Sequence, residues 1–318
     1  MKQIVTITMN PALDLSASID KVVTTHKLRC GPGVLDPGGG GVNVSRVVKR
    51  LGGSSTAIYM AGGPMGQAYR ELLEAEGVEG QAIAIEDNTR LSFTADETQS
   101  GEQYRFVLEG PTLREPEWRA CLDALSGIVG QDDLVVASGS LPPGAPDDFY
   151  GRIAVIAAQA GARCLVDTSG APLRATLEQG VHFIKPNLRE LRDLTGARLE
   201  TPEEQQEAAM NIVRKGQSSI VALTLGADGA LLASAEGTIR APAWKVEKPR
   251  SAVGAGDSFV GAFVLALWQG RTLREAMRYA SAAGAAALLT PATELCRRED
   301  VERFEREMAA AEGETASG

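Results

Sequence analysis

A glycine-rich segment with one acidic residue carries the most specific chemical signal in the sequence. Residues 251–261 read SAVGAGDSFVG and lead into an apolar helical pattern, so Gly254, Ala255 and Gly256 stand at a predicted helix N-terminus. Backbone N–H groups converge at such an end, and with the helix dipole they bind anions such as a phosphate oxygen. Asp257 beside this anion hole is suited to take a proton from an attacking hydroxyl group. The alternative is that Asp257 only caps the helix, where aspartate is favoured.

Two familiar nucleotide motifs do not describe this segment. A Walker loop needs a Gly-Lys-Ser/Thr sequence, which does not follow here. In a dinucleotide fingerprint a third glycine would stand where this sequence has Phe259. The missing glycine disfavours a dinucleotide-dependent oxidoreductase.

A run of four glycines within residues 36–44 (DPGGGGVNV) is the second signal. It removes every side chain where a ligand could lie flat against the backbone. Asn43 follows in the first turn of a predicted helix and offers both a donor and an acceptor to hydroxyl groups. Taken alone, the run is also explained by a flexible turn.

Two further segments suit a nucleotide and its metal. Asn187 and Glu190 follow a predicted strand at i and i+3, so they share one helical face, and such a pair can hold Mg²⁺ through waters. An ordinary helix start with an acidic residue explains the pair about equally well. Residues 224–230 (TLGADGA) predict a hairpin turn that could pass close to a nucleotide phosphate.

Basic residues gather in segments that lack helical pattern: Lys27, Arg29, Arg90 and Arg105. In an acidic protein this grouping suggests a phosphate clamp. A solvated basic face is the simpler explanation if these residues are considered alone.

The elements that must position these groups are strands alternating with helices. Apolar, non-alternating strands are predicted at residues 4–9, 56–60, 134–137, 164–166, 181–185, 219–225 and 230–233. Helices are predicted at residues 42–51, 147–161, 257–269, 273–289 and 300–312. This alternation predicts an α/β fold with a mainly parallel central sheet covered by helices on both faces.

Two segments break this rhythm with strands of period two. They lie at residues 14–34 and 89–107, and we expect insertions at about 12–36 and 88–110 to form a small β-sheet lid on a single domain spanning residues 1–318. The alternative is that they are edge strands of the main sheet.

Composition and charge exclude several classes of function. The chain has 318 residues, 44% of them hydrophobic, which excludes a largely disordered protein, and its net charge of −9 gives no bulk attraction for nucleic acid or an anionic membrane. No apolar stretch approaches the ~18 residues of a membrane span, and residues 1–9 read as a strand, not a signal peptide. The four cysteines form no CxxC pair, which disfavours a zinc site. We therefore expect a cytoplasmic protein with reduced thiols.

Together these motifs closely resemble the PfkB-type, ribokinase-like carbohydrate kinase family over nearly the whole chain. Residues 37–44 are similar to its first signature and residues 251–261 to its second, while residues 138–144 (SGSLPPG) and 185–187 (KPN) are further landmarks. Residues 27–30, the all-glycine run and residues 100–107 are most similar to the phosphofructokinase branch, in its minor, ribokinase-type 6-phosphofructokinase form. The resemblance implies a ribokinase-like fold and a dimer that forms through the lid.

The resemblance also implies a role for individual positions. Asp257 would be the base, and Gly254, Ala255 and Gly256 the anion hole. The positions that would hold the sugar and its phosphate are Asp14, Gly39, Asn43, Ser140, Arg90, Arg105 and Lys27. The positions on the nucleotide side would be Lys185, Asn187, Thr224, Gly226 and Gly229, with Glu190 near Mg²⁺.

Many relatives also bind K⁺ beside the anion hole, and Ser251 and Val253 match that loop. Thr290, Ala292 and Glu294 depart from the Asn, Gly and Arg of close relatives, which leaves the cation requirement open.

The function implied is the ATP-dependent conversion of fructose 6-phosphate to fructose 1,6-bisphosphate, a glycolytic step. Alternatives are a 1-phosphofructokinase, a tagatose-6-phosphate kinase, or a sugar-sensing protein without turnover. The intact Asp257 segment argues against the last of these.

Overall fold

The structure is a computed structural model that describes residues 2–291 and 293–315. Its strands are β1 (Ile4–Thr8), β2 (Ala12–Ile19), β3 (Val34–Gly38), β4 (Thr56–Ala61), β5 (Glu79–Ala84), β6 (Arg90–Glu97), β7 (Gln103–Val107), β8 (Leu134–Ser138), β9 (Arg163–Asp167), β10 (Val181–Ile184), β11 (Ser218–Thr224), β12 (Ala230–Ser234) and β13 (Gly237–Ala241). Its helices are α1 (Gly40–Arg50), α2 (Gly63–Ala75), α3 (Glu115–Ile128), α4 (Phe149–Gln159), α5 (Gly170–Gln179), α6 (Leu188–Thr195), α7 (Pro202–Arg214), α8 (Ala255–Trp268), α9 (Leu273–Ala287) and α10 (Arg298–Thr315), with a short 3₁₀ turn at Gly226–Asp228.

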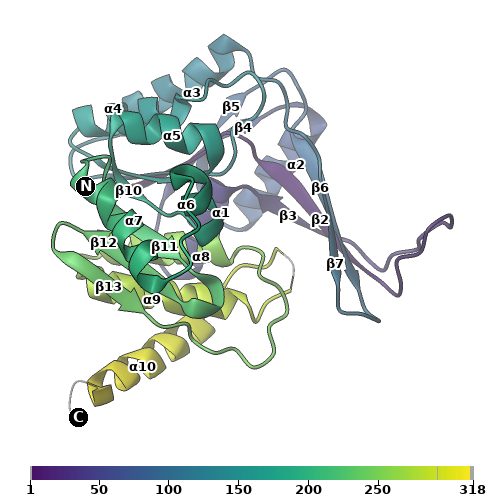
Figure 1. The fold of residues 1–318 in the computed structure, drawn as a ribbon. Coiled ribbons are helices and arrows are strands. Elements are labelled where there is room, and N and C mark those ends of the chain that lie inside the picture. The colour runs from purple at the N-terminus through teal and green to yellow at the C-terminus, as the bar shows by residue number, and fades with distance from the viewer. Residues whose placement is uncertain (1, 292, 316–318) are drawn as a thin grey trace.

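Nine strands form the large sheet, in the order β13-β12-β11-β10-β9-β8-β1-β4-β5 (Figure 1). The strands from β5 to β11 pair in parallel, and only the β11-β12-β13 end is antiparallel. Strands β1 and β8 are buried at every residue, because helices cover both faces. The predicted ribokinase-like α/β fold with a mainly parallel sheet is therefore confirmed.

The helices divide between the two faces of this sheet. One buried core joins it to α1, α8, α9 and α10, and the other joins it to α3, α4, α5, α6 and α7. The predicted helix at residues 257–269 is α8, whose run from Ser258 to Ala266 is buried throughout. An apolar helix of this kind serves as the centre of its layer. No helix among the described residues is long and apolar enough to cross a membrane.

Four strands form a separate small sheet, in the order β3-β2-β6-β7, which projects from the side of the main body (Figure 1). The period-two pattern arises because alternate residues point to opposite faces of these strands. The register places Asp14, Ser92 and Arg105 on one face, and Leu15, Phe93 and Phe106 on the other. A sheet separate from the main one agrees with the predicted small β-sheet.

Candidate active site

The carboxyl ends of five parallel strands meet at one edge of the large sheet and supply much of the site. Asn10 follows β1, Ser140 follows β8, Asp167 ends β9, Lys185 follows β10 and Thr224 ends β11. Ligands of open α/β sheets bind at this edge, where connecting loops leave a crevice. The helix starts of α1 and α8 close the site from the side.

The start of α8 shows that Asp257 does not cap its helix. Gly254 is the N-cap residue with φ 74°, a left-handed conformation that favours glycine, and a Cβ there would lie 2.7 Å from Leu295 Cδ2. The cap has no side-chain hydrogen bond. The Asp257 carboxylate instead accepts a hydrogen bond from Asn43 Nδ2 at 2.8 Å. The carboxylate is therefore directed across to α1, beside the first amides of α8.

Burial controls the titration of this carboxylate. Burial raises the pKa of Asp257 to about 6, with Asp167 and Asp14 also raising it, whereas the Asn43 hydrogen bond and Lys185 lower it. A base with this pKa is ionised at neutral pH and still basic enough to take a proton from a hydroxyl group.

Lys185 is held by Asp167, a residue that the sequence reasoning did not identify. The Lys185 Nζ lies 3.2 Å from Asp167 Oδ1, and both side chains are largely buried. Burial lowers the pKa of Lys185, but Asp167, Glu190 and Asp257 outweigh it and raise the pKa. The ammonium group lies 3.6 Å from the position that a Cβ on Gly256 would take, so a fixed positive charge stands next to the predicted anion hole.

The glycine run is required by close backbone packing. A Cβ on Gly40 would lie 2.3 Å from Ser138 Oγ, and one on Gly41 would lie 2.3 Å from the Ile7 carbonyl oxygen. Gly39 has φ 124°, outside the range of ordinary side chains. The run is thus a tight passage that brings α1 and Asn43 against the ends of β1 and β8.

Four residues predicted to hold the sugar or its phosphate lie around this passage: Asp14, Arg90, Asn43 and Ser140. Arg90 donates to the carbonyl oxygens of Leu108 and Asn10, and Asn10 Nδ2 donates to Ser140 Oγ at 3.2 Å. Arg90 Nε and Asn10 Oδ1 are buried without a hydrogen-bond partner in the described part of the chain. Buried polar atoms are normally paired, so a polar ligand is the natural partner for these two.

Asp14 lies close to the predicted phosphate clamp. Burial raises its pKa to about 6, against the lowering effects of Arg90, Arg105 and a hydrogen bond from Ser92. Its register partner Ser92 and the Arg105 side chain are on the same face of the small sheet. The structure thus brings Arg90 and Arg105 together near Asp14.

Within one chain, Lys27 does not lie beside Arg90, Arg105 and Asp14. It is exposed on the loop between β2 and β3, which extends away from the body (Figure 1). Its contact with a sugar phosphate stays a prediction.

Next to the start of α8, and lined in part by Ala255 and Gly256, lies a cavity of about 330 Å³. Four predicted nucleotide residues line it: Asn187, Thr224, Gly226 and Gly229. Ala255 and Gly256 of the predicted anion hole line it too, whereas the sequence did not point to other lining residues such as Trp244, Pro242, Ser281, Gly284 and Leu288. A largely apolar cavity of this kind suits a flat heterocyclic base.

Asn187 and Glu190 form a capping box at the start of α6. The Glu190 amide donates to Asn187 Oδ1 at 2.9 Å, and the Asn187 amide donates to Glu190 Oε2 at 2.8 Å. Burial raises the pKa of Glu190 and Asp167 raises it further, while the Asn187 hydrogen bonds and Lys185 lower it. Asn187 and Glu190 therefore do begin a helix, as the alternative explanation has it, but Glu190 also faces the charged pocket around Lys185 and Asp167.

The segments matched to a potassium loop lie beside α8. The Val253 amide donates to Ser251 Oγ, and the single hydroxyl hydrogen of Thr290 lies within hydrogen-bond reach of the carbonyl oxygens of both Ala287 and Glu294. Ala292 lies outside the described residues. The Thr290 hydroxyl thus ties together backbone carbonyls of the kind that would coordinate a cation.

Residues 7–300 match the profile of the pfkB family carbohydrate kinases. The chain belongs to this family. It is 45% identical over 302 residues to the ATP-dependent 6-phosphofructokinase isozyme 2 of Mycobacterium tuberculosis, covering 95% of this chain and 88% of that one. It is 40% identical over 305 residues to the enzyme of the same name from Escherichia coli, covering 96% and 98%. The crystal structure of Escherichia coli phosphofructokinase-2 with fructose 6-phosphate aligns with a TM-score of 0.92 at 38% identity, over 97% of this chain and 100% of that one.

A PfkB kinase needs a base, an electrostatic cradle for the transferred phosphoryl group, and two substrate pockets. Gly256, next to Asp257 in the sequence, lines the apolar cavity, and Asp14, which Arg90 approaches, acts on the Asp257 carboxylate. Phosphoryl transfer asks the protein mainly for positioning and charge stabilisation. The helix N-terminus and Lys185 could supply the charge, and Asp257 could accept the hydroxyl proton.

Proposed function

We propose that this protein transfers the γ-phosphoryl group of ATP to fructose 6-phosphate and forms fructose 1,6-bisphosphate. The observation that carries the proposal is the Asn43–Asp257 hydrogen bond, which holds a carboxylate beside an uncapped helix N-terminus. Asp257 takes the proton of the sugar hydroxyl group as the hydroxyl oxygen attacks the γ-phosphorus. The bond between the γ-phosphorus and the β–γ bridging oxygen breaks, and ADP leaves with that oxygen. The amides of Gly254, Ala255 and Gly256 and the Lys185 ammonium group stabilise the charge that develops.

The sugar-phosphate group binds beside Arg90 and Arg105, and the sugar hydroxyl groups bind Asp14, Asn43, Gly39 and Ser140. The orphaned Arg90 Nε and Asn10 Oδ1 support this placement, because a phosphosugar offers both acceptors and donors. We also propose Asn10 as a sugar contact.

The nearer relatives favour fructose 6-phosphate over its isomers. The 1-phosphofructokinase of Borreliella burgdorferi is 31% identical to this chain, below the 40–45% of the two 6-phosphofructokinases. An enzyme of fructose 1-phosphate or a tagatose phosphate is the alternative that the assay below must exclude.

Mg²⁺ fits the acidic side of the nucleotide pocket. Asp167 lies 3.2 Å from the Lys185 ammonium group, and Glu190 and Asp257 are near enough to raise its pKa as well. Glu190 would hold the hydrated ion through a water, and the ion would neutralise phosphate charge. K⁺ at the Ser251–Val253 loop is a further proposal, supported by a structure of Escherichia coli phosphofructokinase-2 in complex with potassium.

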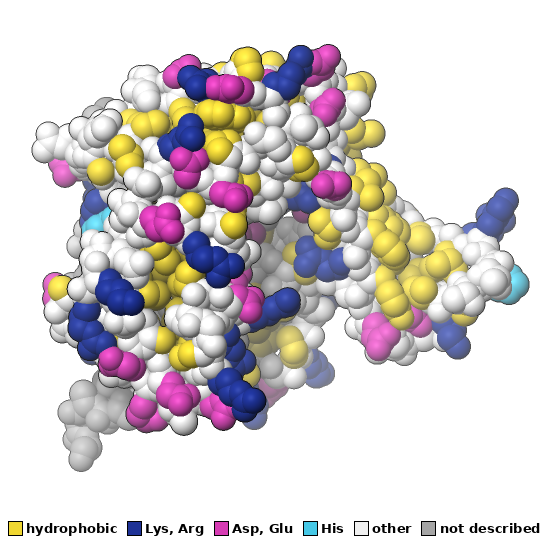
Figure 2. All heavy atoms as spheres, turned by 45° about the horizontal axis from the view of Figure 1, so that its top comes forward, with side chains coloured by type: hydrophobic (Ala, Val, Ile, Leu, Met, Phe, Trp, Pro, Cys, Tyr) yellow, Lys and Arg dark blue, Asp and Glu magenta, His cyan; other side chains and the backbone are white. Residues whose placement is uncertain are grey.

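The small sheet would serve as a lid and as a dimer interface in a cytoplasmic enzyme. Figure 2 shows hydrophobic side chains gathered along the projecting sheet, and Leu35 and Phe106 on its apolar face are 37% and 56% exposed. Apolar patches of this kind mark association sites. A tetrameric inhibited form is known for Escherichia coli phosphofructokinase-2, so larger assemblies are a natural comparison.

The test is an ADP-release assay with ATP and Mg²⁺ across fructose 6-phosphate, fructose 1-phosphate, tagatose 6-phosphate and fructose. We expect the highest kcat/KM with fructose 6-phosphate, and the Asp257→Asn variant controls for contaminating kinases. A higher kcat/KM with another phosphosugar would reassign the substrate. No turnover of any sugar would support a sugar-sensing protein instead.

A further inference from the structure

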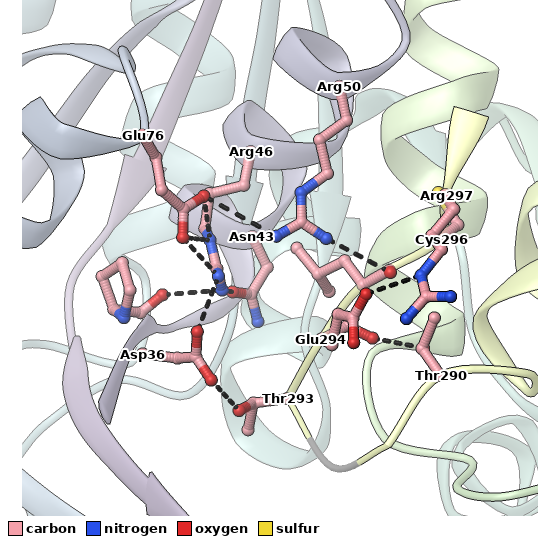
Figure 3. A network of polar contacts seen from close by, with 12 residues as sticks. Asp36, Asn43, Arg46, Arg50, Glu76, Thr290, Thr293, Glu294, Cys296 and Arg297 are labelled. Carbon is pink, nitrogen blue, oxygen red and sulfur yellow. Dashed lines mark hydrogen bonds and ion pairs between the residues drawn. The ribbon is translucent and has the colours of Figure 1, made fainter. Parts of the chain in front are cut away.

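Among the residues that the structure describes, Arg46 on α1 is the largest side chain that is fully buried, and it belongs to no predicted site. Its guanidinium group lies at the centre of a polar network between α1, β3 and the end of α2 (Figure 3). A buried charge of this size needs partners on every side. The hydrogen-bond partners of the Arg46 guanidinium group indicate its role.

Two carboxylates and one carbonyl hold the guanidinium group in place. Arg46 Nε donates to Glu76 Oε2 at 2.8 Å and Nη2 donates to Glu76 Oε1 at 2.6 Å, a two-point contact. Nη2 also donates to Asp36 Oδ1 at 3.2 Å, and Nη1 donates to the Pro37 carbonyl oxygen at 3.1 Å. Asp36 in turn accepts from Thr293 Oγ1 at 2.6 Å. These contacts fix the plane of the group.

The remaining contact reaches the active site. Arg46 Nη1 donates to Asn43 Oδ1 at 3.3 Å, one helical turn away. An arginine has only donors and a carboxylate only acceptors, so the amide between Arg46 and Asp257 has a single orientation that satisfies both. In that orientation Asn43 Nδ2 faces Asp257 Oδ2.

We propose that Arg46 is a positioning residue that fixes the Asn43 amide so that its N–H donates to the Asp257 carboxylate. Without Arg46 the amide is free to turn and present its carbonyl oxygen to the carboxylate, which would repel the ionised base. This inference rests on the proposed function for its kinetic readout only.

The expected consequence is a change in the pH profile. The charged groups that act on Asp257 are Asp167, Lys185 and Asp14. The charge of Arg46 lowers the pKa of Asp14, so Arg46→Gln also changes this neighbour, whereas Arg46→Lys keeps the charge and tests the positioning of Asn43 alone. A hydrogen bond to a charged group contributes about 1.5–3 kcal/mol, so its loss should move the acid limb of kcat up by about one pH unit or more. For a shift of one unit from pH 6, the ratio of kcat at pH 5.5 to kcat at pH 8.5 falls about eightfold.

Three variants distinguish the positioning of the Asn43 amide from the effect of the Arg46 charge and from a general effect on stability. Arg46→Lys keeps the positive charge but has one nitrogen, which Glu76 attracts away from Asn43. Arg46→Gln removes the charge as well. Arg50→Gln is the matched control, because Arg50 also contacts Glu76, at 3.9 Å, and its other bond is to the Leu295 carbonyl oxygen.

We expect the shifted acid limb in both Arg46 variants and not in Arg50→Gln. In an Asn43→Ala background, Arg46→Lys should add no further shift, since the Asn43 amide through which Arg46 acts on Asp257 is already absent. An unshifted limb in Arg46→Lys, or an equal shift in Arg50→Gln, would refute positioning and leave Arg46 a purely structural or long-range charge.

A readout without turnover keeps this inference separate from the proposed function. The titration of the Asp257 carboxyl group can be followed by ¹³C NMR of aspartate-labelled protein and assigned by its absence in Asp257→Asn. We expect the same upward shift there. If the wild type does not turn over fructose 6-phosphate but the titration still shifts, the proposed function fails and the positioning role stands; an unmoved titration overturns the positioning role itself.

Discussion

Replacing Asp257 by asparagine should make the protein more stable at neutral pH while it removes catalysis. The change keeps the shape of the side chain and an oxygen that can accept from Asn43 Nδ2, the partner seen in the structure at 2.8 Å. It removes the negative charge and the ability to take a proton. We expect kcat to fall by roughly 10²–10⁴, the usual range for a lost general base.

The stability gain follows from the sign of the pKa shift. The pKa of Asp257 rises from 3.8 to about 6 on folding, mainly through burial. The native protein therefore binds this proton more tightly than the unfolded chain, and ionisation disfavours the fold. The penalty is absent below about pH 4, grows between pH 4 and 6, and is complete above pH 6. At 1.36 kcal/mol per unit it reaches about 3 kcal/mol, an upper limit because the side chain is partly open to the pocket.

The assay compares urea or thermal unfolding of wild type and Asp257→Asn at pH 5 and pH 8. The variant's stability advantage should be about 1.4 kcal/mol larger at pH 8 than at pH 5. Asp123→Asn, at an exposed position on α3, controls for the general effect of removing one negative charge.

Two results would refute this reasoning. A variant whose kcat stays within a few-fold of wild type would show that Asp257 is not the base. A variant that is less stable than wild type at pH 8 would show that the carboxylate is a stabilising group, as a helix cap would be.

Three further predictions concern the metal, the phosphate and the dimer. Glu190→Gln should raise the Mg²⁺ concentration needed for half-maximal rate and leave the sugar KM nearly unchanged; an unchanged Mg²⁺ titration would leave Glu190 only its capping role. Arg105→Ala should raise the KM for fructose 6-phosphate about tenfold or more, because the loss of a hydrogen bond to a charged group costs about 1.5–3 kcal/mol, and it should leave activity on fructose unchanged. Arg90→Ala should have the same effect and should also lower the melting temperature, because Arg90 donates to two backbone carbonyl oxygens. Equal losses on both sugars would mean that these arginines only support the sheet. Phe106→Asp should convert a dimer to a monomer in sedimentation, whereas Val155→Asp, at an exposed position on α4, should not; a dimer that survives Phe106→Asp places the interface elsewhere.

The sequence allowed the fold to be predicted where a strand or helix carries a strong pattern. Strand β1 and helix α8 are apolar at nearly every position, and both were predicted within a few residues. Helix α7 and strand β5 were not predicted. The start of α7 carries a readable capping box, Thr201 with Glu204, but its helix is mostly polar. Strand β5 (EGQAIA) is an edge strand with one β-branched residue, so local propensity gives little signal.

The candidate site divides in the same way. Asp257 and Asn43 could be found because glycines mark the turns that place them. Arg46 could not, because its burial depends on Glu76, which is thirty residues away in the sequence and reaches it only through the packing of α2. Asp167 had a weak signal, an acid at the carboxyl end of an apolar strand, that could have been read as a site position.

The charges of the pocket explain how a chain of net charge −9 can hold two anionic substrates. The overall field of such a protein repels phosphate, so attraction must be local. Lys185 stays protonated despite burial because Asp167, Glu190 and Asp257 raise its pKa. The N-terminus of α8 adds a positive partial charge that no pH change removes. These two groups would suit one transferring phosphoryl group, but Asp167, Glu190 and Asp257 offset the single ammonium group of Lys185 and leave little positive charge there for the rest of a triphosphate. In the proposed function a divalent ion would therefore enter with the nucleotide, and the acidic side chains that look unfavourable for ATP alone would become favourable for its metal complex.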